Sequence, residues 1–202
     1  MTKLPAIFSA IILLSACTAF NRSYVIKERA ENFSFAPAWT VQRKAHRVES
    51  SSASKQYLYF VHDAQNANLR LCLKTSETEA TRETASVTAK EIVNRFKSKN
   101  KAQKNIVTVE LRKSLEQNIL INLYNVVVAG EYWEKREYLK EKGAEKNYTA
   151  YKCDTVVKIK RTDLAKAIEA SKARISQQIT DKSKKAWNSS LDSYIADLKI
   201  EN

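Results

Sequence analysis

Hydrophobic and polar residues follow two different periods along this chain, and the change of period separates strands from helices. Residues 56–62 (QYLYFVH) are almost continuously aromatic and β-branched, which is typical of a strand. From Asn68 the apolar positions recur at helical spacing, and Asn68 can cap a helix that runs to about Lys99. The two halves of this helix carry their apolar residues on nearly opposite faces. Either the helix lies between two layers, or it breaks near Ala80.

The following segments predict a hairpin and the element before it. Residues 109–123 place leucine and isoleucine four apart, which favours a helix, although residues 106–109 also suit a strand. Residues 124–138 and 148–161 predict two strands that pair as a hairpin. In the second strand, apolar residues and lysines alternate, so one face is expected in the core and the other in solvent. A further short strand is predicted within residues 39–48, after the proline-punctuated stretch 33–39.

Two amphipathic helices are predicted at the end of the chain, over residues 163–180 and 182–200. The second has a basic first turn and an apolar side that includes Trp187. Such a helix either lies in a membrane interface or docks on its own domain, and we expect docking. The predicted fold class is α+β: a small antiparallel sheet of about three to four strands packed by long helices, with a helical C-terminus.

The first seventeen residues have the pattern of a secretory signal. Lys3 precedes an apolar run over residues 4–14, which is too short to span a bilayer, and small residues follow. The ending Leu14-Ser15-Ala16-Cys17 resembles the lipobox of bacterial lipoproteins. This resemblance implies cleavage before Cys17, which is then linked to diacylglycerol and N-acylated. Residues 1–16 are thus expected to be removed, residues 17–32 to form a lipidated tether, and residues 33–202 to form a single domain.

The same resemblance implies a location. In lipoproteins of bacteria with two membranes, an aspartate after the lipidated cysteine commonly retains the protein at the inner membrane. The residue here is Thr18, which favours the outer membrane and leaves open whether the domain faces the periplasm or the outside. In that compartment we expect a membrane contact through the lipid and an envelope protein partner, and no nucleic acid.

The chain is strongly basic, with a formal net charge of +13. Such a surface favours anionic partners, of which the envelope offers peptidoglycan and lipopolysaccharide. The densest group of positive residues is a lysine-rich connection, and its candidate contacts are Lys97, Lys99, Lys101 and Lys104. The alternative is that these lysines only complement the dipole at a helix end.

Three further residues are candidates for defined roles. Cys72 and Cys153 either form a disulfide in an oxidising compartment or remain two buried thiols. Trp133 either stacks on a glycan or belongs to a cross-strand aromatic pair.

No pattern of a catalytic, cofactor or metal site stands out. His46 and His62 lack a partner at zinc-ligand spacing. The chain has only two glycines, Gly130 and Gly143, which are too few for a glycine-rich phosphate-binding loop. We therefore expect a protein that is not an enzyme, with no cofactor and no metal.

The body of the chain resembles a broad group of small outer-membrane antigen lipoproteins, whose α+β domain recurs in a flagellar ring protein. The matching stretches are residues 57–60, 80–96, 126–133 and 151–167. The glycine usual after the first strand of that group is replaced here by His62-Asp63-Ala64. The resemblance implies a non-catalytic role in envelope assembly or maintenance through protein contacts. The alternative is a binding module for an anionic envelope polymer.

Overall fold

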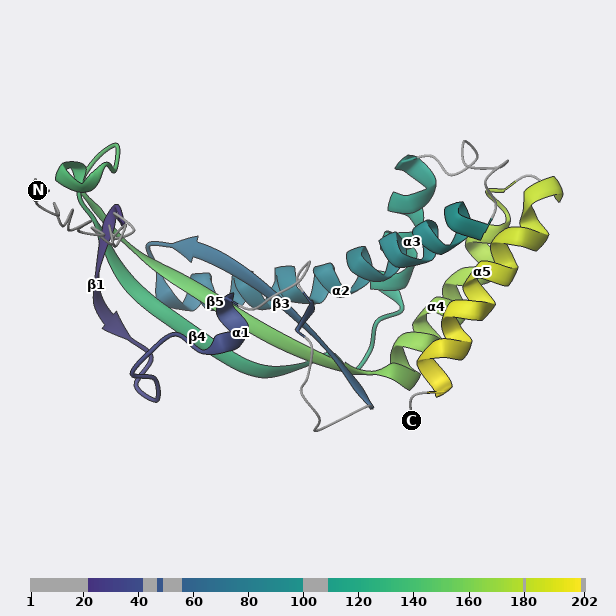
Figure 1. Ribbon diagram of the computed structural model, residues 1–202, viewed down its shortest axis with the longest axis horizontal. Helices are drawn as coiled ribbons and strands as arrows, with labels where there is room; N and C mark the ends of the chain where they lie inside the picture. Colours follow the sequence, from purple (N-terminus) through teal and green to yellow (C-terminus); the bar gives the residue numbers. More distant parts are fainter. Residues whose placement is uncertain (1–21, 42–46, 49–55, 100–108, 180, 201–202) are drawn as a thin grey trace, which may run out of the picture.

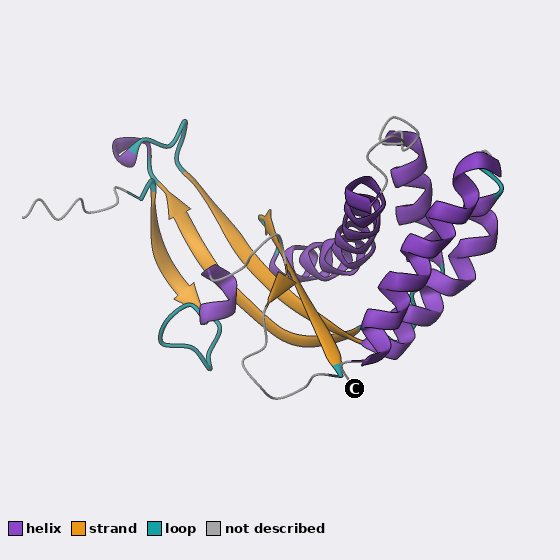
Figure 2. Cartoon of the chain, turned by 45° about the vertical axis from the view of Figure 1, so that its right-hand side comes forward, coloured by secondary structure: helices purple, strands orange, loops and turns teal. Residues whose placement is uncertain are grey.

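The protein is elongated, with a curved antiparallel sheet at one end and a cluster of helices at the other (Figure 1). The computed structural model describes residues 22–41, 47–48, 56–99, 109–179 and 181–200. The α+β class with a helical C-terminus is confirmed. A long helix, α2 (Leu69–Lys99), runs along one face of the sheet and continues into the helical cluster (Figure 2).

The sheet has the strand order β1-β4-β5-β3-β2, and every neighbouring pair is antiparallel. The strands are β1 (Tyr24–Arg29), β2 (Arg47–Val48), β3 (Tyr57–Asn66), β4 (Val127–Tyr138) and β5 (Tyr148–Lys160). The predicted hairpin of β4 and β5 is therefore confirmed, and β5 lies at the centre of the sheet. Its residues from Cys153 to Val157 are all buried, because both faces of the sheet are covered there.

Helix α2 (Leu69–Lys99) is continuous. Of the two alternatives offered by the sequence, the long helix between two layers is therefore confirmed, and the break near Ala80 is wrong. Its start is capped by Asn68, whose Oδ1 accepts a hydrogen bond from the Leu71 amide at 3.1 Å. The first half packs small side chains onto β3 and β5, where Ser76 Oγ and Thr155 Oγ1 are 2.6 Å apart. The second half enters the helical cluster and is covered on several sides.

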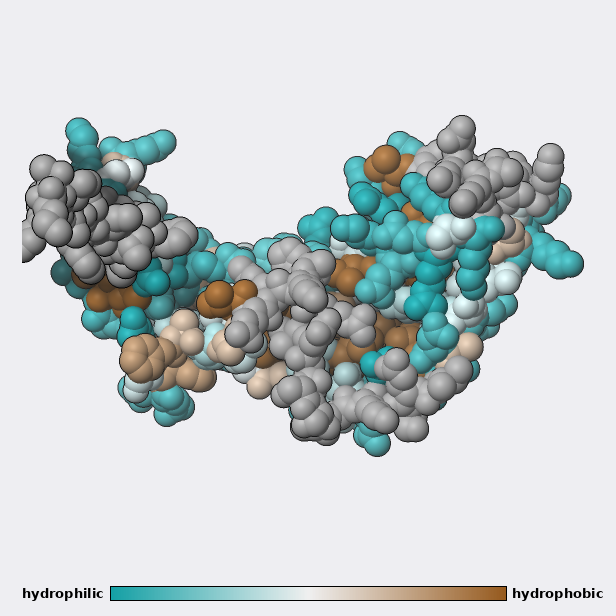
Figure 3. All heavy atoms as spheres, in the orientation of Figure 1, coloured by the Kyte–Doolittle hydropathy of each residue, from teal (hydrophilic) through white to brown (hydrophobic). Residues whose placement is uncertain are grey.

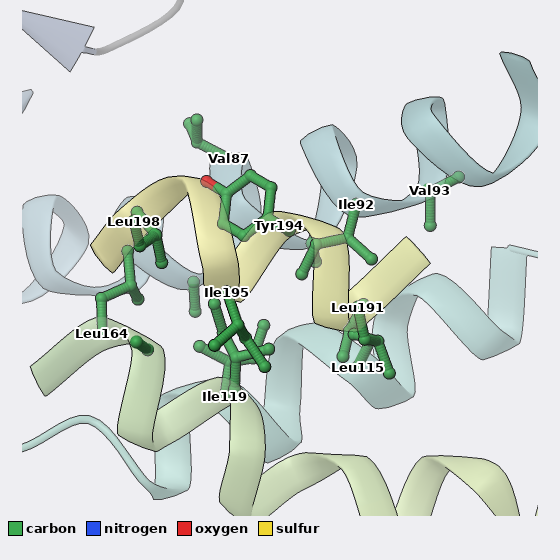
Figure 4. Close-up of a cluster of buried hydrophobic side chains, with 14 of the residues drawn as sticks. Val87, Ile92, Val93, Leu115, Ile119, Leu164, Leu191, Tyr194, Ile195 and Leu198 are labelled. Atoms are coloured by element: carbon green, nitrogen blue, oxygen red, sulfur yellow. The ribbon is translucent and has the colours of Figure 1, made fainter. Parts of the chain in front are cut away.

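The helical cluster consists of the end of α2 with α3 (Val109–Ile121), α4 (Arg161–Ser176) and α5 (Asp181–Ile200). The predicted ranges of the last two helices are close to those observed, and the ambiguous segment before β4 is a helix. Apolar side chains of all four helices converge in one core (Figure 4). Trp187 is completely buried there, and its ring is 5.3 Å from that of Phe96. Helix α5 thus docks on its own domain, as expected.

Two predictions at the start of the domain are wrong. Residues 24–29 were expected in a tether but form strand β1, because they pair with the outer edge of β4 in register Tyr24↔Tyr138. The charged residues at the end of this edge strand alternate in sign and form ion pairs with β4. Lys27 Nζ is 2.6 Å from Glu137, and Lys135 Nζ is 2.7 Å from Glu28. The strand predicted within residues 39–48 does not begin at Trp39, because the described residues there form the short helix α1 (Ala38–Val41), and strand β2 is described at Arg47–Val48.

Cys72 and Cys153 form a disulfide that joins the first turn of α2 to the middle of β5. Their Cα atoms are 5.8 Å apart, and both residues are fully buried. Of the two possibilities left open by the sequence, the disulfide is therefore the one observed. Because the bond closes a chain segment of 81 residues, it restricts the unfolded chain strongly.

Replacing both cysteines by serine should lower the free energy of unfolding by about 4–5 kcal/mol, the entropy of opening a loop of this length. Urea denaturation monitored by tryptophan fluorescence measures the change, and wild-type protein kept in reductant should match the variant. An unchanged denaturation midpoint in reductant would show that the bond adds nothing to stability.

Candidate functional site

The face of the sheet opposite α2 carries a group of ionisable side chains. Side chains on a strand alternate between faces, so Cys153 and Thr155 point toward α2 whereas Lys152 and Asp154 point away. On β4, the directly paired Tyr132 and Glu134 share this second face. We call the set the sheet-face cluster; its members are Arg29, Asp63, Tyr132, Glu134, Arg136, Lys152 and Asp154.

The centre of the sheet-face cluster is the carboxylate of Glu134, whose side chain is only 5% exposed. One oxygen accepts a hydrogen bond from the Tyr132 hydroxyl at 2.7 Å. The other accepts from Arg136 Nε at 2.8 Å, and Arg136 Nη2 lies at the same distance. Arg29 Nε is 3.8 Å from the first oxygen. Two guanidinium groups and a phenol thus compensate one buried carboxylate, whose burial without such partners would be costly.

A second ion-pair group links β3 to β5. Lys152 Nζ is 2.6 Å from Asp63 Oδ2 and 3.3 Å from Asp154 Oδ1. The side chain of Asp154 is only 7% exposed, so its charge depends on such partners. Within the sheet-face cluster, three cationic and three anionic side chains balance each other.

The segment after β1 covers part of the sheet-face cluster. Phe33 packs its ring edge-on against Tyr132, with centroids 5.5 Å apart, and Arg29 Nη1 donates a 2.7 Å hydrogen bond to the Ser34 carbonyl. Trp39 lies over Gly130, where an added Cβ atom would make an ordinary contact with the indole ring at 3.6 Å and would lie closest to Val156 Cγ1, at 3.2 Å. Between this cover and the sheet lies a cavity of about 300 Å³. Its lining includes Arg22, Tyr24, Phe35, Thr40 and Val41 in addition to members of the sheet-face cluster.

These surroundings shift the pKa values of two members of the cluster, Tyr132 and Arg136. Burial raises the pKa of Tyr132, and its hydrogen bond to Glu134 raises it further, so the phenol stays protonated. Burial alone would lower the pKa of Arg136, but its hydrogen bonds and its attraction to Glu134 outweigh burial and raise the pKa. The Arg136 guanidinium also lies over the Tyr24 ring, 4.1 Å from its centroid. Each carboxylate of the cluster is paired with a cationic side chain. These pairs connect the strands to one another and to the covering segment, and aromatic and cationic side chains line the cavity between them.

Among the described residues singled out in the sequence, the disulfide brings Cys72 and Cys153 together, whereas Trp133, Lys97 and Lys99 lie outside the sheet-face cluster. Trp133 is half-buried on the α2 face of the sheet, where its ring meets Tyr151 edge-on at 5.8 Å. This is the aromatic pair that the sequence offered as one alternative, and glycan stacking stays a prediction. Lys97 and Lys99 lie in the last turn of α2, and Lys99 Nζ donates to Ser193 Oγ at 3.1 Å. Cys17, Lys101 and Lys104 lie outside the described residues.

The sheet-face cluster was missed by the sequence analysis. Lys152 and Asp154 were expected on the solvent side of β5. They point away from α2, but the expectation of a solvent face is wrong there, because Asp154 is buried under the covering segment and Lys152 is partly buried. The sequence signal that could have revealed the cluster is the matching alternation on β4. Tyr132, Glu134 and Arg136 occupy every second position there and therefore lie on one face of the strand. What could not be foreseen is the cover, because residues 33–39 gave no indication of the face on which they pack.

Comparison of the chain with family models, curated proteins and solved structures finds no match. In the part of the chain that the structure describes, no helix is long and apolar enough to cross a membrane. The same residues contain no group of three or more histidine, cysteine, aspartate or glutamate side chains that could hold a metal ion.

Replacing Glu134 by alanine should lower the free energy of unfolding by about 3–5 kcal/mol, because Arg136 and Tyr132 then remain buried without their acceptor. Chemical denaturation measures this loss. The matched control is Glu131→Ala, an exposed carboxylate on the same strand, for which we expect a change of less than about 0.5 kcal/mol. Similar losses for both variants would contradict a special role of Glu134. If Glu134→Ala does not fold, Glu134→Gln keeps one acceptor and should show a smaller loss.

Proposed function

We propose that the chain is a lipid-anchored lipoprotein of the bacterial cell envelope, whose domain acts without catalysis through protein contacts in envelope assembly or maintenance. The observation that carries the proposal is the order Leu14-Ser15-Ala16-Cys17 at the end of a short apolar run. Strand β1 begins at Tyr24, seven residues after Cys17, so the anchor would sit directly beside the folded domain.

The disulfide supports export from the cytoplasm. Bonds of this kind persist in oxidising compartments such as the periplasm and are rare in reducing ones. Cys72 and Cys153 are fully buried and join two elements of the core, which is the position of a structural bond. An outer-membrane location is favoured by Thr18, which occupies the place of the aspartate that retains lipoproteins at the inner membrane.

The sheet-face cluster supports a binding or scaffolding domain. Its carboxylates are engaged by cations, and the phenol of Tyr132 is kept protonated, so these groups stabilise the fold and its cover. A domain held in one shape by such pairs suits contacts that require a defined surface.

Exposed apolar side chains support contacts with a protein. Ile121, Tyr124 and Val127 lie close together in the sequence, at the connection from α3 to β4, and are 64%, 69% and 51% exposed. Single exposed apolar residues are ordinary, whereas a local group of three marks a surface that gains from being covered.

Replacing Cys17 by serine should abolish incorporation of labelled fatty acid and release the protein from the membrane fraction, because the thioether cannot form. Metabolic labelling and fractionation of cells measure both effects. Thr18→Ser is the control that keeps the cysteine and should behave as wild type, while Thr18→Asp should move the protein to the inner membrane. Normal processing and membrane association of the Cys17→Ser protein would overturn lipid anchoring.

A photo-crosslinking residue placed at Tyr124 should yield a discrete crosslinked envelope protein in living cells, because this position lies in the exposed apolar group. The same residue placed at Lys166, an exposed polar position on α4, is the control and should not capture that protein. Absence of a product at position 124, or the same products from both positions, would count against the assigned surface.

A further inference from the structure

The tip of the β4–β5 hairpin and the beginning of the described chain lie at the same end of the molecule (Figure 1). We call residues 139–147 the hairpin tip. The Leu139 amide donates a 3.1 Å hydrogen bond to the Ser23 carbonyl, and Tyr24 is paired with Tyr138 in the sheet. The helical cluster lies at the opposite end, since α4 follows β5 immediately at Arg161.

The number of residues before β1 limits how far this end can be from a lipid anchor. Arg22 is five residues after Cys17, and an extended chain covers at most about 3.6 Å per residue, or about 18 Å in total. This bound holds whatever path residues 18–21 take. By contrast, β5 has 13 residues and spans about 40 Å at about 3.3 Å per residue, so the helical cluster begins far beyond that reach.

The hairpin tip is basic and exposed. Lys140, Lys142 and Lys146 are exposed, against two exposed carboxylates, Glu141 and Glu145. Arg22 is also exposed and directly precedes Ser23, whose carbonyl is bonded to Leu139 at the base of the tip. Figure 3 shows this projecting tip, at the upper left, as hydrophilic. A basic side chain near an anionic membrane surface contributes about 1 kcal/mol, and the attraction acts within about 8 Å at physiological salt. Four positive charges against two negative ones would therefore favour close approach to such a surface.

The backbone of the hairpin tip is held in one conformation. Gly143 adopts a φ of 92°, which is open to glycine, and its amide donates a 3.0 Å hydrogen bond to the Lys140 carbonyl. Asn147 Oδ1 accepts a 2.7 Å hydrogen bond from the Lys140 amide, and the rings of Tyr138 and Tyr148 stack at 4.5 Å below the tip. The lysines are thus displayed from an ordered loop at the outer end of the hairpin.

We propose that the hairpin tip rests on the anionic phospholipid headgroups of the membrane that carries the anchor, which directs the helical cluster away from that membrane. This inference rests on the proposed lipid attachment at Cys17. Residues Lys140, Lys142 and Lys146, with Arg22, form the contact, and the short connection to Cys17 holds them at the surface.

The experiment uses the lipidated protein in vesicles that contain phosphatidylglycerol and a quencher attached to the lipid headgroup. A fluorophore is placed on Lys142→Cys at the tip, which leaves Lys140, Lys146 and Arg22 to make the contact, or on Ala170→Cys, an exposed position on α4 in the helical cluster. The native Cys72 and Cys153 are bonded and buried, so only the new thiol is labelled. We expect several-fold stronger quenching at position 142 than at position 170. Equal quenching at both positions, or none at 142, overturns the proposal.

A charge variant tests the headgroup contact itself. Quenching at position 142 should be stronger in vesicles with phosphatidylglycerol than in purely zwitterionic vesicles, and Lys140→Gln with Lys146→Gln should remove this difference. Lys166→Gln with Lys185→Gln is the control in the helical cluster and should leave it intact. A lipid dependence that survives loss of the tip lysines overturns the proposal. Protein that fails to float with the vesicles at all contradicts lipid anchoring instead, so the two failures can be told apart.

Discussion

Burial of the central strand β5 on both faces is the constraint on which the rest of the structure depends. From Cys153 to Val157 each side chain is shielded from water, by α2 on one side and by the sheet-face cluster and its cover on the other. Polar groups in such a strand require partners. The hydroxyl of Thr155 forms a hydrogen bond with that of Ser76 on α2, and the carboxylate of Asp154 forms an ion pair with Lys152 on the same strand. The carboxylate of Glu134 on the neighbouring strand is compensated by Arg136 and Tyr132. The segment between β1 and α1 packs over this group through the contact of Phe33 with Tyr132.

Much of the fold could be predicted because its largest elements have regular patterns. The cap at Asn68 and the apolar side of α5 are local signals that the structure bears out. The alternation expected of β5 fails from Cys153 to Val157, where both faces of the strand are buried. Strand β1 was missed because an edge strand with alternating charges buries little apolar surface and resembles a solvated segment until its partner strand is known. The disulfide could be offered only as an alternative, since the distance between Cys72 and Cys153 is set by tertiary packing.

The candidate site was harder to foresee than the fold. Charged residues on β4 and β5 were visible, but a charge on a strand is normally exposed, and nothing in residues 33–39 indicated that they would cover it. The site depends on three strands and a crossing segment, so its members are brought together only by the pairing registers. The carboxylate of Glu134 illustrates this, because it contacts Arg136 on its own strand and lies near Arg29 on the adjacent strand β1. Lys152 likewise joins Asp154 on its own strand to Asp63 on β3.

The two ends of the molecule have different physical characters. One end combines the start of the domain with the hairpin tip and is polar; the other is a helical core around Trp187. The hairpin of β4 and β5 joins these ends as a continuous pair of strands, and α2 reinforces it along much of its length. This arrangement suits a domain that separates an attachment point from a surface of interaction.

The position of the disulfide also restricts when an exported chain can complete its fold. Cys72 belongs to α2 and Cys153 to β5, so the bond encloses α2, α3 and β4. A chain that crosses a membrane from its N-terminus delivers Cys72 first and must expose most of its length before Cys153 arrives. In the export that we propose, the central strand and the bond that joins it to α2 are therefore in place only late in translocation, and until then the thiol of Cys72 can be oxidised with a non-native partner.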